Sequence, residues 1–455
     1  MNNDLTRDAF APDFIWGVAT SAFQIEGGYD ASGKGPSIWD TFCENPANTA
    51  DGSDGKTACE HLKNWSEDLD LIESLGVNAY RFSISWPRVQ PLGEGAWNEE
   101  GFSFYENLLR GLKARGIAAH LTLYHWDLPQ ALQDKGGWAN RKVCDAFTAY
   151  AKEVARRFGD NLASITTHNE PWVVAVLGHE QGIFAPGLKS KKIAFQVSHH
   201  LLLSHGMAIR AMREQGCKAK LGIVLNQSPI YPATNHPNDI FKARIDDGLV
   251  VRWYMDPLLK GFYPQDVLDF IGDDAPSVIA GDMALIQQPI DFIGINYYTR
   301  NFSSSGNPWD IKASGNEVTD MGWEVYPKGL TELLCRLNTD YVLPEILITE
   351  NGAAFKDKLV RGRVHDERRV AYLRDHIQAV KDAIDEGVNV GGYFAWSLMD
   401  NFEWASGYAK RFGIVYVDYT TQERHLKDSA IWYQRFLNRT QSGKHQAETN
   451  YQTVQ

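Results

Sequence analysis

Short apolar runs alternate with longer amphipathic stretches along most of the chain. The runs are rich in branched and aromatic residues and are bounded by polar residues, glycine or proline, which is typical of buried strands. Eight such runs occur, at 14–18, 79–83, 118–124, 164–168, 221–225, 291–295, 345–349 and 390–396. The pattern therefore predicts eight short strands.

Amphipathic segments with helical spacing separate these runs. Residues 65–75 place Leu69, Ile72 and Leu75 on one face, and residues 143–158 repeat the pattern before Gly159. Apolar residues three and four positions apart predict helices with one buried face. Two further helices are predicted at 369–384 and 428–437.

Strands that alternate with helices indicate a parallel sheet, and eight of them favour a closed barrel. The competing doubly wound sheet usually carries a Gly-rich turn after its first strand, whereas Glu26-Gly27-Gly28 is not of that form. We therefore predict an α/β fold, a single (β/α)₈ TIM barrel spanning 10–440. The polar tail at 441–455 is expected to be disordered.

Composition narrows the class of protein. The chain has 455 residues, 44% of them hydrophobic, with 14 Trp and a net charge of −12. This acidic balance argues against nucleic-acid and anionic-membrane partners. The five cysteines are scattered and the first residues lack an apolar leader, so a cytoplasmic protein with reduced thiols is expected. No metal or cofactor motif appears, so we expect no cofactor and a small-molecule substrate. A homo-oligomer is left open.

Two glutamates occupy an unusual position at the ends of predicted strands. Glu350 follows the run 345–349, and Glu170 follows the run 164–168. A buried, ionised Glu is costly unless it is paired, and the carboxyl ends of barrel strands usually form the active site. Other polar and aromatic side chains come to the same rim, namely Gln24, Arg81, His125, Trp126, Asn169, Asn296, Tyr298, Trp396, Glu403 and Trp404.

Two carboxyl groups that flank a sugar ring can hydrolyse a glycosidic bond. One must be protonated to serve the leaving oxygen, and the other must be ionised to attack the anomeric carbon. Arg81 is the predicted ion-pair partner that keeps Glu350 ionised, which leaves Glu170 as the group that holds the proton.

Three motifs resemble the signatures of the glycoside hydrolase family 1 β-glucosidases: Thr167-His168-Asn169-Glu170-Pro171, Ile348-Thr349-Glu350-Asn351-Gly352 and Asn401-Phe402-Glu403-Trp404. The resemblance covers the chain from Phe14 to about Phe436. It implies a (β/α)₈ barrel in which Glu170 is the acid/base and Glu350 the nucleophile of a retaining double displacement.

The same resemblance implies roles for the surrounding residues. The hydroxyls of the terminal sugar would be held by Gln24, His125, Asn169, Glu403 and Trp404, and Trp126 would be a further substrate-binding residue. Trp396 would form the floor, Asn296 and Tyr298 would line the nucleophile side, and Trp323 would be a platform for the leaving group. His168 departs from the family pattern, where Leu is common, and strand alternation predicts that it points away from the site.

Glu403 bears on the choice of sugar. A carboxylate there can accept hydrogen bonds from the 4- and 6-hydroxyls and would repel a 6-phosphate. Relatives that cleave 6-phosphosugars have Tyr where this chain has Phe412, so that specificity is rejected. A β-glucosidase acting on aryl or alkyl β-glucosides and cello-oligosaccharides is expected. β-Galactosidase, β-fucosidase or transglycosylase specificity, or a non-catalytic sugar-binding protein, are the alternatives.

Overall fold

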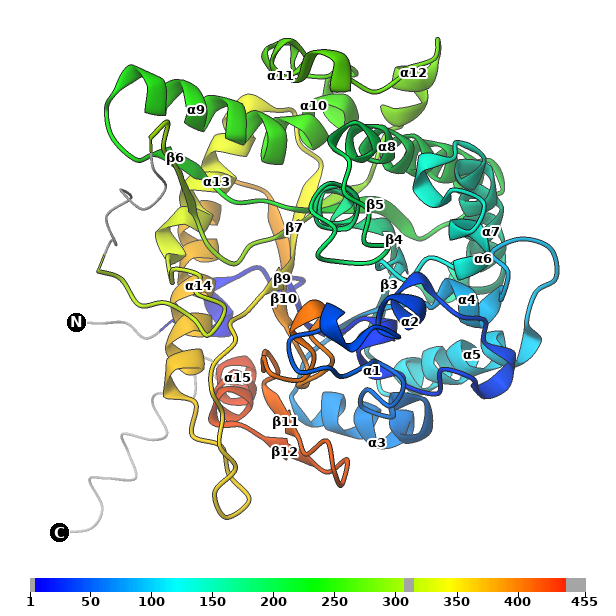
Figure 1. Cartoon of the computed structure of the whole chain (residues 1–455). Coiled ribbons are helices and arrows are strands. Elements are labelled where there is room, and N and C mark those ends of the chain that lie inside the picture. The colour runs from blue at the N-terminus through cyan, green and yellow to red at the C-terminus, as the bar shows by residue number, and fades with distance from the viewer. Residues whose placement is uncertain (1–4, 307–314, 439–455) are drawn as a thin grey trace.

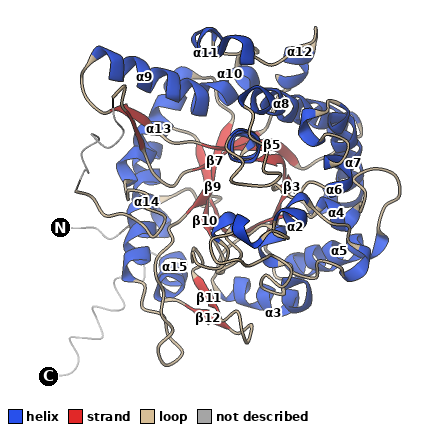
Figure 2. Ribbon diagram, viewed as in Figure 1, coloured by secondary structure: helices blue, strands red, loops and turns tan. Residues whose placement is uncertain are grey.

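The computed structural model describes residues 5–306 and 315–438. Eight parallel strands close into a barrel in the order β1-β10-β9-β7-β5-β4-β3-β2 (Figures 1 and 2). Their bounds are β1 Ile15–Ala19, β2 Ala79–Ser83, β3 Ala118–Tyr124, β4 Ser164–Asn169, β5 Lys220–Asn226, β7 Phe292–Asn296, β9 Glu345–Asn351 and β10 Val390–Trp396. The predicted (β/α)₈ barrel is confirmed, with each strand within two residues of its predicted run.

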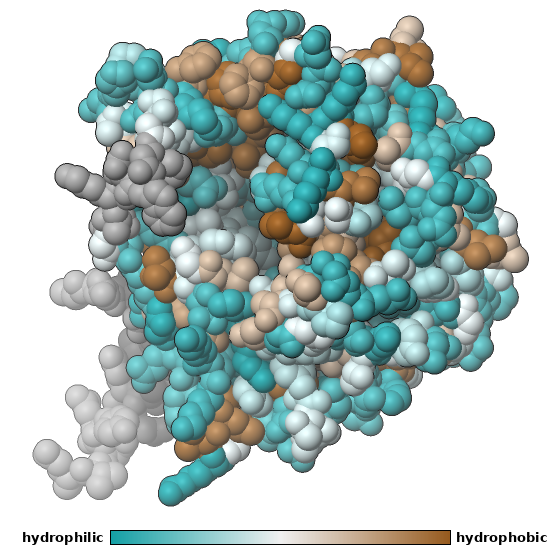
Figure 3. Space-filling view, in the orientation of Figure 1, coloured by the Kyte–Doolittle hydropathy of each residue, from teal (hydrophilic) through white to brown (hydrophobic). Residues whose placement is uncertain are grey.

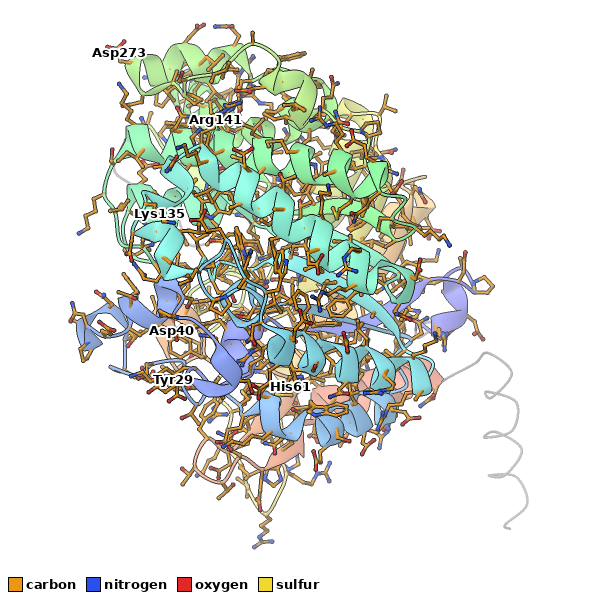
Figure 4. All side chains as sticks on the ribbon, turned by 90° about the vertical axis from the view of Figure 1, so that its right-hand side faces the viewer. Tyr29, Asp40, His61, Lys135, Arg141 and Asp273 are labelled. Atoms are coloured by element: carbon orange, nitrogen blue, oxygen red, sulfur yellow. The ribbon has the colours of Figure 1, made fainter. Side chains whose placement is uncertain are left out.

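Helices form the layer outside the barrel (Figure 2). The predicted helices are confirmed as α3 His61–Ser74, α7 Lys142–Phe158, α14 Glu367–Asp385 and α15 Asp428–Asn438. The helices that were not predicted are α5 Glu99–Ala114, α8 Lys191–Glu214 and α13 Pro327–Asp340, and the shorter α1 Ala22–Ile25, α2 Ile38–Phe42, α4 Trp86–Val89, α6 Gln130–Gln133, α9 Pro237–Asp247, α10 Trp253–Leu259, α11 Gln265–Ile271 and α12 Asp282–Ile286. Helix α7 packs against α8 and α3 against α5, and side chains fill the space between these helices (Figure 4).

The strand interiors are buried because each strand has helices on one side and the barrel centre on the other. In β4 and β7, every residue is buried. The centre is tightly filled, since a Cβ on Gly17 would lie 2.3 Å from the ring of Phe394. Parallel register brings the carboxyl ends to one rim, where Asn296 of β7 pairs with Glu350 of β9 and Ala19 of β1 with Trp396 of β10.

Two small sheets lie outside the barrel and were not predicted. Strand β6 (Ile230–Pro232) pairs in parallel with β8 (Asn301–Ser303), and β11 (Val415–Val417) pairs antiparallel with β12 (Arg424–Leu426). The long segment after β7 carries β8 and a short hairpin closed by the bridge between Val318 and Glu324. The predicted tail at 441–455 lies outside the described residues.

A buried ionic network joins the loops that follow β9 and β10 to helices α14 and α15. Lys427 is fully buried, and its Nζ lies 2.5 Å from Asp357 Oδ2 and 2.7 Å from Asp400 Oδ1. Six charges balance in the network, three of each sign: Arg369, Arg411, Lys427, Asp357, Asp366 and Asp400. Because Asp400 directly precedes the segment 401–404, this network fixes the loop that carries Glu403.

Replacing Lys427 by Met should destabilise the protein strongly. The change leaves two buried carboxylates without their shared cation, which costs about 3–5 kcal/mol and should lower the thermal-unfolding temperature by roughly 3–5 °C. Differential scanning calorimetry at one scan rate measures the shift.

The matched control is Lys63→Met, at an ion pair with Glu60 where the Lys63 side chain is 68% exposed. An exposed pair contributes about 0–1 kcal/mol, so this variant should unfold close to the wild type. Equal shifts in the two variants would contradict the role given to the buried network.

Candidate active site

A cavity of about 310 Å³ opens at the carboxyl end of the barrel, where the surface is hollowed near the centre of the face in Figure 3. Its wall is built from the ends of β3, β4, β7, β9 and β10 and the loops that follow them. The predicted residues that line it are His125, Trp126, Glu170, Asn296, Tyr298, Trp323, Glu350, Trp396, Glu403, Trp404 and Phe412. Two strand-end glutamates therefore face one cavity.

Glu350 is held by donors on both of its oxygens. Arg81 Nη1 donates to Oε1 at 2.6 Å, and the Tyr298 hydroxyl donates to Oε2 at 2.5 Å. Glu350 is 3% exposed, so the protein rather than water must solvate its carboxyl group. A buried guanidinium and a hydroxyl donor both favour the ionised form of a carboxyl group. Glu350 is thus suited to act as a carboxylate.

Glu170 lies in a different electrostatic environment. Burial, followed by the charge of Glu350, raises the pKa of Glu170 from 4.5 to about 8. Its Oε1 accepts a hydrogen bond of 2.5 Å from Asn296 Nδ2. Two neighbouring carboxyl groups with proton affinities pushed apart are the arrangement expected of an acid and a nucleophile.

Side-chain amides connect the two glutamates behind the cavity wall. Asn169 Oδ1 accepts hydrogen bonds from Arg81 Nη2 at 2.7 Å and from Asn296 Nδ2 at 3.1 Å. Asn296 was expected on the side of Glu350, but its amide nitrogen donates to Glu170. This side chain therefore positions the opposite carboxyl group, while the backbone of Asn296 is the register partner of Glu350.

A third carboxyl group, that of Glu403, lies at the far wall of the cavity. Gln24 Nε2 donates to Glu403 Oε2 at 3.3 Å and to Asn401 Oδ1 at 2.9 Å. Burial, followed by the charge of Glu350, raises the pKa of Glu403 from 4.5 to about 8. Gln24 is fully buried behind the wall and orients Glu403.

Aromatic rings form the remaining walls. The imidazole of His125 stacks on Trp396 and on Trp404, with ring centroids 5.9 and 6.0 Å apart. Burial, with a smaller effect of Arg81, lowers the pKa of His125 well below 6.5, so the ring is neutral. Trp323 and Phe412 pack against each other with centroids 6.1 Å apart and their planes tilted by 49°. Flat apolar walls with a few polar groups suit a sugar ring.

Three residues at the site have positive φ angles, which residues other than glycine rarely adopt. The φ angles are 77° for Trp126, 50° for Glu170 and 49° for Trp404. Such conformations each cost of the order of 1–3 kcal/mol and occur preferentially at functional sites. Among the described residues, no group of three or more His, Cys, Asp or Glu side chains is arranged to hold a metal ion.

Comparison with known proteins identifies the family. The sequence model of glycosyl hydrolase family 1 matches residues 6–442. The chain is 48% identical to β-glucosidase A of Acetivibrio thermocellus, over 95% of this chain and 99% of that protein. It is 42% identical to the bifunctional β-D-glucosidase/β-D-fucosidase of Bifidobacterium breve, over 94% and 98% of the two chains. The chain belongs to glycosyl hydrolase family 1.

Solved structures of the family share the fold closely. The family 1 β-glucosidase of Thermotoga maritima in complex with isofagomine lactam is 45% identical and superposes with a TM-score of 0.91. The match covers 94% of this chain and 98% of that one. The protein is therefore a glycoside hydrolase on a (β/α)₈ barrel. No helix within the described ranges is long and apolar enough to span a membrane.

The structure brings the residues of the family motifs together as the sequence indicates. Gln24, Arg81 and Asn169 lie behind the wall and hydrogen-bond to residues that line it. His168 points away, as expected, and packs on Phe147 with a centroid distance of 4.4 Å.

The sequence analysis missed the cavity residues Trp172, Val173, Leu177, Phe184, Asn226, Ser228, Val250, Thr299, Asn301 and Met321. Trp172 and Asn226 carried a signal, since Trp172 lies two residues after Glu170 and Asn226 is the last residue of β5. The others come from loops, short helices and the start of β8, whose paths no local pattern reveals.

Glu403→Gln should alter the pH dependence of stability. The folded protein holds a proton on Glu403 up to about pH 8, whereas in an unfolded chain this group loses it near 4.5. The wild-type group therefore becomes progressively destabilising as pH rises from about 4.5 through 8. Glutamine does not titrate, so the unfolding temperature of Glu403→Gln relative to wild type should increase from pH 5 to pH 9.

Thermal unfolding at both pH values measures this difference, with Glu44→Gln, at an exposed position, as the control. A difference that stays constant between pH 5 and pH 9 would show that Glu403 is not held in its neutral form.

Proposed function

We propose that the protein is a retaining β-glucosidase that removes the non-reducing β-D-glucosyl unit of aryl or alkyl β-glucosides and cello-oligosaccharides. The observation that carries this proposal is the contrast between its two facing carboxyl groups. Glu350 accepts hydrogen bonds from Arg81 and Tyr298, whereas the pKa of Glu170 is raised to about 8. A retaining glycosidase needs one carboxylate and one carboxylic acid across the same bond.

In the first step, Glu350 attacks the anomeric carbon while Glu170 donates its proton to the departing oxygen. The bond from the anomeric carbon to the aglycone breaks, the aglycone leaves as an alcohol, and the glucosyl unit becomes an ester of Glu350. The hydrogen bond from Tyr298 and the ion pair with Arg81 orient the attacking oxygens. The developing positive charge on the sugar lies beside a buried carboxylate, which stabilises it.

In the second step, water replaces the aglycone. Because the ester of Glu350 is neutral, it no longer raises the pKa of Glu170, which favours the carboxylate form of Glu170. Glu170 then takes a proton from water, and the oxygen of that water attacks the anomeric carbon. The ester bond breaks, glucose leaves with the configuration of the substrate, and both glutamates return to their first states.

The far wall supports a glucosyl specificity. Glu403, oriented by Gln24, can accept hydrogen bonds from the 4- and 6-hydroxyls, and the aromatic side chains of Trp396 and Trp404 line the same cavity. The same wall is compatible with a fucoside, and a relative with 42% identity is named for both activities. Rates on nitrophenyl β-D-glucoside, β-D-fucoside and β-D-galactoside, measured side by side, rank these sugars, while alcohol acceptors test transglycosylation.

Glu350→Ala should reduce turnover of nitrophenyl β-D-glucoside by several orders of magnitude, because it removes the nucleophile. Azide should restore part of the rate and give the glucosyl azide of inverted configuration, since the small anion occupies the space of the lost carboxylate. Product NMR identifies that configuration. Absence of rescue from a folded variant would place the nucleophile elsewhere, and wild-type silence on all three sugars would favour the sugar-binding alternative.

Glu170→Ala should have an effect that depends on the leaving group. Cellobiose and alkyl glucosides need a proton on the departing oxygen and should lose roughly 10²–10⁴-fold in rate. Dinitrophenyl glucoside, whose leaving group needs no proton, should lose much less in its first step. Steady-state and burst kinetics separate the two steps, and equal losses for both substrates would contradict the assignment of Glu170.

A further inference from the structure

A second cavity, of about 230 Å³, lies beside the active site and takes no part in the mechanism derived above. It is lined by helices α8, α9 and α10 and by two π-helical segments, η6 (Val173–Glu180) and η7 (Gly248–Arg252). Segment η6 begins three residues after Glu170, and η7 directly precedes α10. Because π-helical turns are rare and frequently accompany functional sites, two of them around one cavity indicate a candidate binding site.

The two cavities share part of their walls. Trp172 and Val250 line both of them, and each side chain is partly exposed. Trp172 stands at the start of η6, two residues after Glu170, and Val250 lies within η7. The second cavity therefore adjoins the active-site cavity at these two residues.

The lining of the second cavity is apolar. Nine of its thirteen residues are aliphatic or aromatic, and all but two of these are larger than Ala: Trp172, Val176, Phe195, Leu249, Val250, Trp253 and Tyr254. Of its four polar members, two are committed to the protein: Ser198 Oγ donates to the carbonyl oxygen of Phe195 and accepts from Trp253 Nε1, while Asp246 binds Lys242 and Ser303. The other two, Glu180 and Lys191, are partly exposed. A polar ligand would lose its hydration against a mostly apolar lining, which selects an apolar ligand.

From this shared wall and this apolar lining, we propose that the second cavity binds the apolar tail of the aglycone, an unbranched alkyl chain attached to the glucosidic oxygen. The proposal rests on the β-glucosidase function proposed above and specifies its substrate class. The glucosyl unit occupies the cavity of Glu170 and Glu350, and the tail passes between Trp172 and Val250 into the apolar cavity behind them. No covalent step is added to the mechanism.

Hydrolysis of a series of alkyl β-D-glucosides tests the proposal. Methyl, butyl, hexyl and octyl glucosides are assayed below their micelle concentrations, and butyl to octyl alcohols are leaving groups of nearly equal basicity. Each methylene that enters the cavity contributes about 0.8 kcal/mol, so kcat/KM should rise about threefold to fourfold per methylene and then level off once the cavity is filled. A flat series in the wild-type protein would overturn the proposal.

Two substitutions fill the cavity from opposite walls. Val176 in η6 and Leu249 in η7 line the second cavity but not the active-site cavity. Val176→Phe and Leu249→Phe should each remove the dependence on chain length and leave the rate on methyl glucoside within about twofold of wild type. Two variants keep the test decisive if one of them fails to fold, which circular dichroism reports.

The matched control is Val342→Phe, the same substitution at a residue that is 96% exposed. It should retain the wild-type chain-length dependence. If Val176→Phe and Leu249→Phe also retain it, the tail does not lie in this cavity and the proposal fails.

Failure of the proposed function gives a different result. A protein that hydrolyses neither aryl nor methyl glucoside would contradict the β-glucosidase function, not the cavity. Calorimetric titration of Glu350→Gln with the same alkyl glucosides then tests the cavity without turnover. Affinity should rise with chain length in Glu350→Gln and stay flat when Val176→Phe is added; equal affinities along the series would overturn the proposal.

Discussion

The ion pair between Arg81 and Glu350 is the interaction on which the active site depends. The buried guanidinium of Arg81 donates to Glu350 at 2.6 Å through one nitrogen and to Asn169 at 2.7 Å through another, and Arg81 is 2% exposed. A carboxylate and a guanidinium are both costly to bury, and they are tolerated only together and with further hydrogen bonds. The ion pair therefore holds Glu350 as a nucleophile, and the charge that it retains raises the pKa of Glu170.

Much of the surrounding structure maintains this arrangement. Asn296 and Asn169 fix the distance between the two glutamates, and Gln24 fixes Glu403. The ionic network around Asp400 then holds the loop in which Glu403 lies. The raised pKa values of Glu170 and Glu403 and the positive φ angles of three residues each lower the stability of the folded protein. All of them lie at the active site, where activity commonly comes at the expense of stability.

The sequence was sufficient for the barrel because a parallel barrel imposes a simple pattern. Eight mostly apolar runs of five to seven residues, separated by amphipathic helices, are compatible with few folds other than a parallel barrel. Glu350 and Glu170 were found because a carboxylate at the end of a buried strand conflicts with that pattern. Phe184, Val250 and Met321 were missed because they reach the cavity from irregular segments, whose positions depend on tertiary packing. The sequence likewise could not show which of the two glutamates the side chain of Asn296 contacts, because that depends on tertiary packing and not on residue spacing.

The central claim is that the charge of Glu350 helps to keep the proton on Glu170. Carbon-13 NMR of labelled glutamate carboxyl groups, with Glu170→Gln to assign the signal, measures the pKa of Glu170 directly. Titration is done on the free protein and on protein in which a 2-deoxy-2-fluoroglucoside has esterified Glu350. The account predicts a pKa of about 8 in the free protein and a clear fall after esterification. An unchanged pKa would contradict it.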